Sequence, residues 1–557
     1  MLARLLIVAA LLAAVLVAPF ALRPKEEKIP AKAERLVIIT PHIESIQSEF
    51  ARAFRAHMRE AHGREVLIDW RQPGGTSEIA RFLRSEYATR FETLWREKSG
   101  LPFTLAIRDA STNPKLDPDK DAIQEGKTFD PTLLKDAPPE AQAAAARRLF
   151  LESGIGCGID LFFGGGAFDF ERQAAAGLLV ARDASGRFGP GALAEEHPEW
   201  FSDAVMPQSF GGEPYRDAGF RWVGAVVSAF GICYNRDVLS RLGIEEAPDE
   251  WSDLEDPRYL GQIALADPTK SGSTTKAFEM LVQERIQTLA RERGLPESEA
   301  VAAGWNDAMR LILRISANSR YFTDSSAKVP RDVAMGDAAA GMCIDFYGRS
   351  YNELHRDPAT GESRIKFVMP EGGTSIGADP IGMLRGAPNP ELAHRFIEFV
   401  LSPEGQKLWN YRPGAPGGPV RHALRRPPIR RDVYTEANFA HMTDPGFDPY
   451  RAAAGFTYHP EWTGSLFTAL RFVIRAACMD PHEEQIVAWE ALLAAGLPDE
   501  GLARFEDVAP ISYEAVVKNI APALRNSDKV AQVRLGRELA EGFRERYLRI
   551  SGEYGRQ

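Results

Sequence analysis

Hydrophobic and polar residues follow two periods along the first part of the chain. Residues 35–40 (RLVIIT) and 65–70 (EVLIDW) are short apolar runs with the composition of strands. Residues 43–63 carry apolar side chains at helical spacing and end at a glycine, and residues 78–88 repeat that spacing after a PGGTS turn. The order strand, helix, strand, helix predicts a parallel α/β sheet.

The same rhythm returns after residue 150. Residues 159–166 (IDLFFGGG) have the composition of a buried strand that ends in three glycines, and residues 168–180 that of a helix that closes at Gly177. Residues 220–235 are a long apolar segment with strand composition. Three later segments continue the pattern: a strand-to-helix junction at 341–352, a strand at 376–385 and an amphipathic helix at 389–409. At 557 residues the chain exceeds one ordinary core, so two or three structural units are expected.

Two regions depart from this pattern. Residues 87–150 are rich in Asp, Pro, Lys and Ala and are interpreted as an insertion. Its DPDKD sequence at 117–121 begins like a calcium loop but lacks the glycine and glutamate that an EF-hand needs, so we interpret it as a solvated turn. A Pro-, Gly- and Arg-rich boundary at 411–431 precedes a mainly helical extension, and its basic run RRPPIRR (425–431) is interpreted as a solvated loop.

The first residues indicate export. A short basic start precedes the uninterrupted apolar run 5–22, and a polar, proline-containing spacer follows it. This is the pattern of a signal peptide or of an uncleaved signal anchor over residues 1–22, and the sequence does not decide between them. A periplasmic or otherwise extracytoplasmic protein is expected, and an uncleaved segment would hold it at the membrane.

Charge and cysteine content exclude two classes of function. The net charge of −10 argues against nucleic-acid binding, which requires a basic surplus. The cysteines Cys157, Cys233, Cys343 and Cys478 are far apart without a C-x-x-C motif, which argues against a clustered zinc site. Three of the four lie in apolar surroundings typical of small buried side chains, and the sequence leaves one disulfide open.

Within the stretch 267–275 (DPTKSGSTT), residues 271–275 place four hydroxyl side chains and a glycine just before a long helical region. One Ser or Thr is enough to cap a helix. The surplus is either redundant capping or an anion site, because helix N-termini present free backbone N–H groups and partial positive charge.

Five stretches, in this order, resemble the type-2 periplasmic solute-binding proteins of ABC importers, near the ferric-ion, thiamine, phosphonate and sugar-phosphate binders. They are LVIITPHIESIQSEFARAF (36–54), DLFFGGGAFDFERQAAAGLL (160–179), FGICYNRDVLSRLGIEEAPDEWSDLEDPRYLGQIALADPTKSGST (230–274), GDAAAGMCIDFYGRSYNE (336–353) and GADPIGMLRGAPNPELAHRFIEFVLSPEGQKLWN (377–410). Members of the family share one scaffold but bind many different ligands, so the resemblance predicts the fold better than it predicts the ligand.

The resemblance implies two α/β lobes that close on a small molecule. The first lobe is expected at 35–227, the second at 228–372, a return to the first at 373–412, and the helical extension at 413–557. The segment 226–235 (VVSAFGICYN) would cross into the second lobe, and the stretch near 372–383 would return.

Three glycine- or hydroxyl-rich turns are candidate ligand contacts. In relatives of this family, the second-lobe turn holds an anion or a ligand phosphate. The other two turns begin a first-lobe helix and follow a first-lobe strand, and tight turn geometry would also explain each of them. The residues are Ser271, Gly272, Ser273 and Thr274; Gly75, Thr76 and Ser77; and Gly164, Gly165 and Gly166.

Single side chains add to these turns. His42 falls where ferric binders of the family place a histidine ligand, and Tyr347 at one member of their tyrosine pair. The other member is Phe346 and the expected glutamate is absent, so ferric binding through His42 and Tyr347 is the second choice. His42 would otherwise pair with an anion when protonated. Arg349 could clamp an anion or form a salt bridge, and Asp379 could contact an amino group or cap a loop. Trp222 and Tyr234 either line the cleft or belong to the core.

We therefore expect the exported binding subunit of an ABC importer, which captures a small organic anion such as a phosphate or phosphonate ester. Its partners are that anion and the importer's membrane subunits, and no cofactor is expected. No hydrolase or nucleotide-binding motif is present, and enzymatic activity is not expected. A ligand-sensing receptor subunit and an exported hydrolase with an unrecognised catalytic set are the competing hypotheses.

Overall fold

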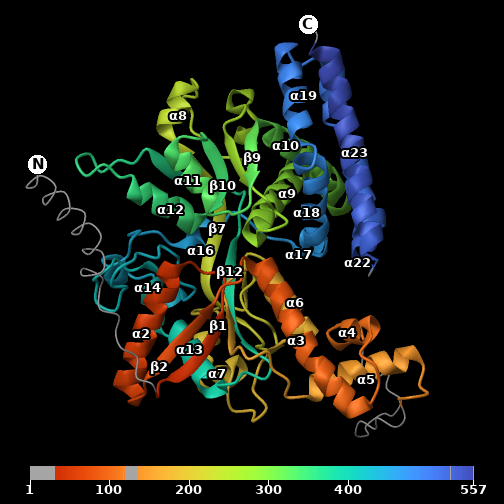
Figure 1. Cartoon of the computed structure of the whole chain (residues 1–557). Helices are drawn as coiled ribbons and strands as arrows, with labels where there is room; N and C mark the ends of the chain where they lie inside the picture. Colours follow the sequence, from red (N-terminus) through yellow and green to blue (C-terminus); the bar gives the residue numbers. More distant parts are fainter. Residues whose placement is uncertain (1–31, 117, 119–133, 527, 556–557) are drawn as a thin grey trace, which may run out of the picture.

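A computed structural model describes residues 32–116, 118, 134–526 and 528–555. The N-terminal apolar segment and, but for Pro118, the DPDKD turn lie outside these ranges. Within the ranges, no helix combines the length and the hydrophobicity that crossing a bilayer requires. Figure 1 shows two lobes, one above the other, joined by long strands at the centre of the molecule.

The first lobe is built on three parallel strands, in the order β2 (Val66–Arg71), β1 (Glu34–Ile39), β3 (Leu161–Phe163). Helix α2 (Glu44–His62) covers the sheet through Ile46, Phe50, Phe54 and Met58, which are buried and spaced one turn apart. Helices α3 (Thr76–Ser99) and α6 (Ala167–Ala176) begin where β2 and β3 end. As predicted, α6 ends at Gly177, whose φ of 83° favours glycine.

One strand belongs to both lobes. β7 (Val223–Asn235) is buried along almost its whole length, which explains its continuous apolar sequence. Its first half pairs antiparallel with β12 (Ile376–Leu384) of the first lobe, and its second half pairs with β10 (Ala340–Ile344) and β11 (Ile365–Val368) of the second lobe. The chain returns through residues 369–375 into β12, so both predicted crossings are present.

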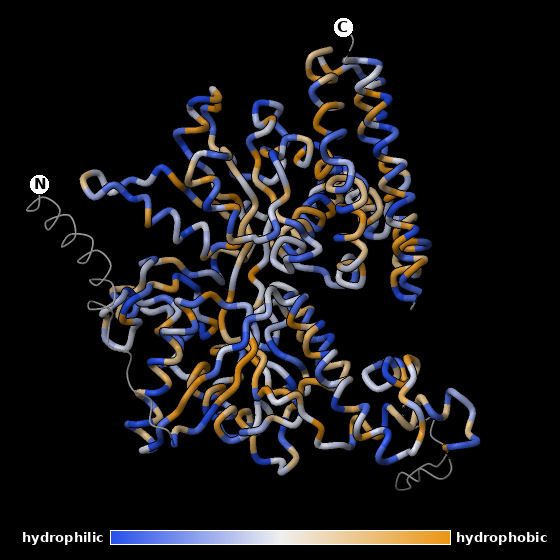
Figure 2. The backbone as a smooth tube through the Cα atoms, in the orientation of Figure 1, coloured by the Kyte–Doolittle hydropathy of each residue, from blue (hydrophilic) through white to orange (hydrophobic). Residues whose placement is uncertain are grey.

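The second lobe extends this sheet through β10, β8 (Ile263–Ala266) and β9 (Ser319–Thr323), which are parallel to one another. Helices pack around these strands, and Figure 2 shows hydrophobic residues gathered along the central strands of the molecule. The helices are α8 (Arg236–Arg241), α9 (Gly272–Arg293), α10 (Glu297–Asn318), α11 (Lys328–Met335) and α12 (Asp345–Leu354).

The expected insertion starts with regular structure. Residues 87–99 continue α3, because Tyr87, Phe91 and Trp95 extend its buried stripe into the first-lobe core. Helices α4 (Leu105–Ser111) and α5 (Pro139–Glu152) pack against the same core. The insertion is therefore an enlargement of the first lobe within the described residues.

The C-terminal extension divides between the lobes. After α13 (Pro390–Leu401) and α14 (Pro403–Asn410), residues up to Ala453 pack into the first-lobe core, and from Phe456 onward the chain packs into the second. The chain thus changes lobe a third time near residue 455. Beyond it, α18 (Phe467–Ile474) packs on α9, α19 (His482–Ala494) packs on α10, and α23 (Lys529–Tyr554) lies along α19; all three are in blue in Figure 1.

Candidate functional site

A cavity of about 890 Å³ lies between the lobes, a size typical of small-molecule sites. The ends of β1, β2 and β3 contribute to it from the first lobe, and the turns before α9 and α12 from the second. This is where α/β sheets bind ligands, because loops at the carboxyl ends of strands meet there. Ten predicted residues line it: His42, Gly75, Thr76, Gly165, Gly166, Ser271, Gly272, Ser273, Tyr347 and Asp379.

Three helix N-termini meet in this cavity, those of α3, α6 and α9. A Cβ on Gly272 would lie 3.1 Å from Oγ1 of Thr76, and one on Gly75 would lie 3.2 Å from the carbonyl oxygen of Lys270. The lobes are therefore in contact here. The first N–H groups of each helix have no acceptor within the helix, so the meeting point carries free donors and partial positive charge.

The serine-rich turn divides its hydroxyls between capping and the cavity. Ser271 Oγ accepts from the Thr274 N–H at 3.2 Å, and Thr275 Oγ1 donates to the Pro268 carbonyl at 2.7 Å. Thr274 is buried and does not line the cavity, so its expected ligand contact is not made directly. Ser273 lines the cavity together with Ser271 and Gly272.

Arg426 is the central cation of the site, and the interpretation of RRPPIRR as a solvated loop is wrong. Its side chain is fully buried and ion-paired with Asp379. Its Nη1 donates to His42 Nε2 at 3.1 Å, and its Nη2 donates to Ser228 Oγ at 2.5 Å. The guanidinium carbon lies 4.6 Å from the centre of the Phe346 ring. A basic residue is buried here because a carboxylate and an aromatic face receive it.

His42 is neutral in this setting. Burial and the neighbouring Arg426 charge hold its pKa well below the ordinary value, so the expected protonated pairing with an anion does not apply. Because Nε2 accepts from Arg426, the proton of the neutral ring is on Nδ1, which has no partner among the described residues. A Cβ on Gly164 would overlap the His42 ring, so this glycine makes room for the imidazole.

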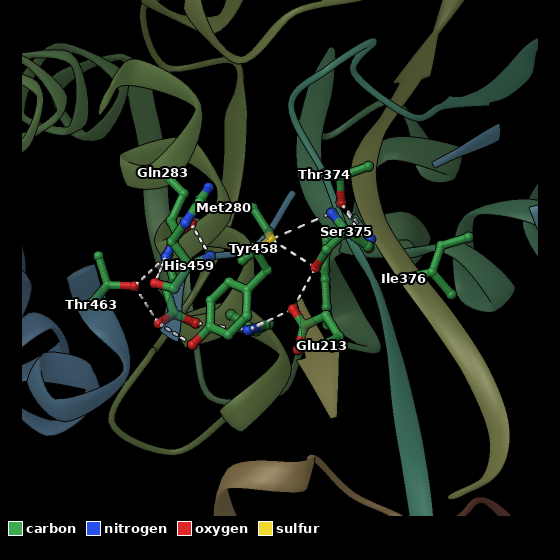
Figure 3. Close-up of polar contacts among 12 residues, drawn as sticks. Glu213, Met280, Gln283, Thr374, Ser375, Ile376, Tyr458, His459 and Thr463 are labelled. Atoms are coloured by element: carbon green, nitrogen blue, oxygen red, sulfur yellow. Dashed lines mark hydrogen bonds and ion pairs between the residues drawn. The ribbon is translucent and has the colours of Figure 1, made fainter. Parts of the chain in front are cut away.

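A second charged group lies at the junction of the lobes (Figure 3). Lys276 Nζ is 2.8 Å from Glu213 of the first lobe and 2.9 Å from Glu279 of its own helix. It also lies 3.5 Å from the centre of the Tyr458 ring, and Tyr458 Oη donates to Glu279 at 3.0 Å. The two carboxylates raise the Lys276 pKa despite burial, so the ammonium is retained and bridges the lobes.

The charged lining contains more acidic than basic side chains. Seven carboxylates line the cavity: Glu78, Asp169, Glu171, Glu213, Glu279, Asp324 and Asp379. Four cationic side chains accompany them: Arg172, Lys270, Lys276 and Arg426. Arg426 and Lys276 are already paired with carboxylates. The carboxylates are hydrogen-bond acceptors, whereas the helix N-termini offer donors, so the cavity suits a ligand with both kinds of group.

Four residues that the sequence offered as possible ligand contacts lie elsewhere in the protein. Arg349 forms a salt bridge rather than a ligand clamp, with Nη1 3.1 Å from Asp444, and stacks on Phe447. Ser77 Oγ accepts from Arg471 Nη1 at 3.3 Å and lies outside the cavity lining. Trp222 is core, and Tyr234 packs against the second-lobe core.

The ferric interpretation conflicts with the charges around its two residues. The Arg426 guanidinium donates to His42 Nε2 and places a positive charge beside the imidazole, and burial raises the Tyr347 pKa, which keeps the phenol protonated. Within the described ranges, no three His, Cys, Asp or Glu side chains gather as a metal site. All four cysteines are buried free thiols.

The chain is similar to known proteins in sequence and in fold. Residues 198–433 match the model of the bacterial extracellular solute-binding protein family. An uncharacterized Haemophilus influenzae protein is 28% identical over 196 residues, which are 35% of this chain and 49% of that one. The Salmonella typhimurium phosphoglycerate transport regulatory protein PgtC is 25% identical over 186 residues, 33% of this chain and 40% of that one.

A putrescine/cadaverine-binding protein of Pseudomonas aeruginosa is 26% identical over 172 residues, 30% of this chain and 44% of that one. The matched segments thus span less than half the length of these curated relatives. One similar solved structure is that of the periplasmic binding protein AfuA from Actinobacillus pleuropneumoniae with fructose-6-phosphate bound. It aligns with a TM-score of 0.49 at 17% identity, and the alignment covers 80% of this chain and 98% of AfuA.

Proposed function

We propose that this chain, whose residues 198–433 match the bacterial extracellular solute-binding protein family, is the exported binding subunit of an ABC importer. It would capture a small hydroxylated organic anion between its lobes. Phosphate and phosphonate esters are the favoured ligand classes. The importer's membrane subunits are the expected partners, and the periplasm or another extracytoplasmic space is the expected location.

The observation that carries this proposal is the meeting of three helix N-termini in one cavity. α3 and α6 come from the first lobe and α9 from the second, with glycines at their first turns. Each N-terminus corresponds to roughly half a positive charge. A phosphate or carboxylate placed between them would accept backbone hydrogen bonds from both lobes and would favour the closed arrangement.

The surplus of carboxylates supports hydroxyl groups on the same ligand. Asp324 and Glu171 line the cavity without an ion-pair partner among the described residues, and they can accept hydrogen bonds from hydroxyls. Phosphoglycerate, which the name of the Salmonella relative contains, has both an anionic and a hydroxyl part. A polyamine, as named for the Pseudomonas relative, would suit the carboxylates but would be repelled by the helix N-termini.

The test is a thermal-shift series on the purified protein with 3-phosphoglycerate, glycerol 3-phosphate, inorganic phosphate and putrescine. A ligand at a hundredfold excess over its Kd stabilises by about 2.7 kcal/mol, which is readily measured. A shift with putrescine alone, or with none of the four compounds, contradicts the proposal. Release of inorganic phosphate from a bound ester would instead support the hydrolase hypothesis.

A ligand-sensing receptor is the second candidate, because the Salmonella relative is named a transport regulatory protein. The ligand site would be the same and only the partner would differ. A deletion strain that loses uptake of the bound ligand supports the importer. One that keeps uptake but loses the transcriptional response to the ligand supports the receptor.

A further inference from the structure

Residues between 458 and 467 line the ligand cavity although they lie beyond the family match, which ends at residue 433. These lining residues are Tyr458, Pro460, Gly464 and Phe467. They come from the turn after the third lobe change, from α17 (Pro460–Thr463), from the short 3-10 helix Gly464–Leu466 and from the first turn of α18. The two lobes alone therefore do not enclose the cavity.

This segment is attached to the second lobe. Gln283 of α9 donates to Thr463 Oγ1 at 2.8 Å and accepts from the His459 N–H at 2.9 Å (Figure 3). On α18, Leu470 and Val473 are buried in the second-lobe core. α18 will therefore move with α9 when the lobes open and close.

The opposite face of α18 touches the first lobe. The rings of Phe467 and Phe168, the latter on α6, have centroids 4.5 Å apart. One turn further, Arg471 Nη1 donates to Ser77 Oγ at the start of α3. Both contacts cross from the second lobe to the first at the edge of the cavity, so opening of the lobes has to break them.

Arg471 has unused hydrogen-bonding capacity next to the site. Its Nε and Nη2 are buried and have no hydrogen-bond partner in the described part of the chain, where no other arginine has two such nitrogens. Burial lowers the Arg471 pKa, and the nearby Asp169 opposes this shift. A buried guanidinium with free N–H groups contributes positive potential where α3 begins, together with the cavity-lining Arg172.

We propose that residues 456–471 form a third wall of the ligand site, in which Phe467 closes the cavity against Phe168 and contacts the ligand, and Arg471 selects for an anionic group at the N-terminus of α3. This inference rests on the proposed function. It also implies that ligand preferences of relatives do not transfer directly, because part of the wall lies outside the shared segment.

Affinity measurements with matched variants test the wall. F467A should weaken 3-phosphoglycerate binding at least about tenfold, because it removes an aromatic contact surface. F472A, on the same helix, is the control: Phe472 packs near Gly536 of α23 and should change Kd by less than about threefold. Equal effects of the two variants, or no effect of F467A, would overturn the role of Phe467.

The role of the Arg471 charge is tested by comparing R471Q with R475Q. R475Q is the control, because Arg475 is exposed and pairs with Asp480. R471Q should weaken 3-phosphoglycerate binding about fivefold or more and flatten its dependence on salt, while R475Q should leave both unchanged. Unchanged binding in R471Q would mean that its free N–H groups bind water only, and the selective role would be refuted.

A cross-linking experiment tests, in the absence of any ligand, whether α18 closes the cavity against α6. The four native cysteines are buried, so a short bis-maleimide should join F168C to F467C but not F168C to F472C. Absence of the first cross-link, or equal yield of both, refutes closure by α18. If the wild-type protein binds no probe but the first pair cross-links, the proposed function fails while the wall stands.

Discussion

Replacing Arg426 by methionine tests the charge arrangement at the centre of the site. The guanidinium is fully buried, and its ion-pair partner Asp379 retains a side-chain exposure of 17%. Removing one partner of a buried pair costs roughly 3–5 kcal/mol, because the other charge is left without compensation. The residual exposure of Asp379 places the expected loss near the lower end, about 3 kcal/mol.

The loss should depend on pH with a definite sign. Burial already raises the Asp379 pKa, and Arg426 opposes that shift. Without Arg426 the folded-state pKa rises further above the unfolded value of about 3.9, so the folded protein binds more protons than the unfolded chain. Its stability then falls as pH increases through that window. The R426M substitution should therefore lower the free energy of unfolding less at pH 5 than at pH 8.

Urea unfolding of R426M, D379N and the double variant at both pH values measures the loss of stability and its dependence on pH. The double variant should be more stable than the sum of the single losses implies, with a coupling of at least about 1 kcal/mol. R421M is the control, because the Arg421 side chain is exposed. A coupling below about 0.5 kcal/mol, or equal losses in R426M and R421M, would refute the assignment of Arg426 as the buried counter-ion.

Three further changes probe the cavity. G272V should weaken ligand affinity about tenfold or more in titration calorimetry and change the unfolding midpoint little, because the valine side chain would meet Thr76 only when the lobes are closed. Unchanged affinity would contradict the contact between Gly272 and Thr76 in the closed form. G164A should cost about 2 kcal/mol in urea unfolding, because a Cβ would overlap the His42 ring at a φ of 89°; a loss below about 0.5 kcal/mol would argue against that packing. Burial raises the pKa of Asp345 from 3.8 to about 6, so the wild type should lose about 2 kcal/mol of stability relative to D345N as pH rises from 4 to 7. Parallel pH profiles of the two proteins would contradict this.

Local patterns predicted individual strands and helices, whereas the two lobes and the crossing strand were predicted from the family resemblance. The unbroken apolar run of β7 is required by burial on both faces, and it predicted a strand there. Gly177 ended α6 as its left-handed conformation demands. Both signals depend on neighbours in sequence, which is why they could be interpreted without a structure.

The centre of the site could not be predicted in the same way. Arg426 lies 384 positions from His42 in the chain, and its neighbours Arg425, Pro427 and Pro428 have the composition of a surface loop. Lys276 is one turn into α9, directly after the hydroxyl-rich turn that predicts an anion site. In both cases the cation is buried because it pairs with a carboxylate that is distant in the sequence, Asp379 or Glu213. No local sequence pattern predicts such a pairing.

The charge pairing also determines how selectivity can arise. Arg426 and Lys276 are neutralised by carboxylates of the protein, so neither offers a full free charge to a ligand. The remaining positive potential comes from the helix N-termini and from the arginines near α6. The N-terminus of α9 belongs to the second lobe, and those of α3 and α6 belong to the first. Under the proposed function, anion affinity would therefore depend on closure: an open form would separate these partial charges and bind the anion more weakly, so the ligand would stabilise the closed form.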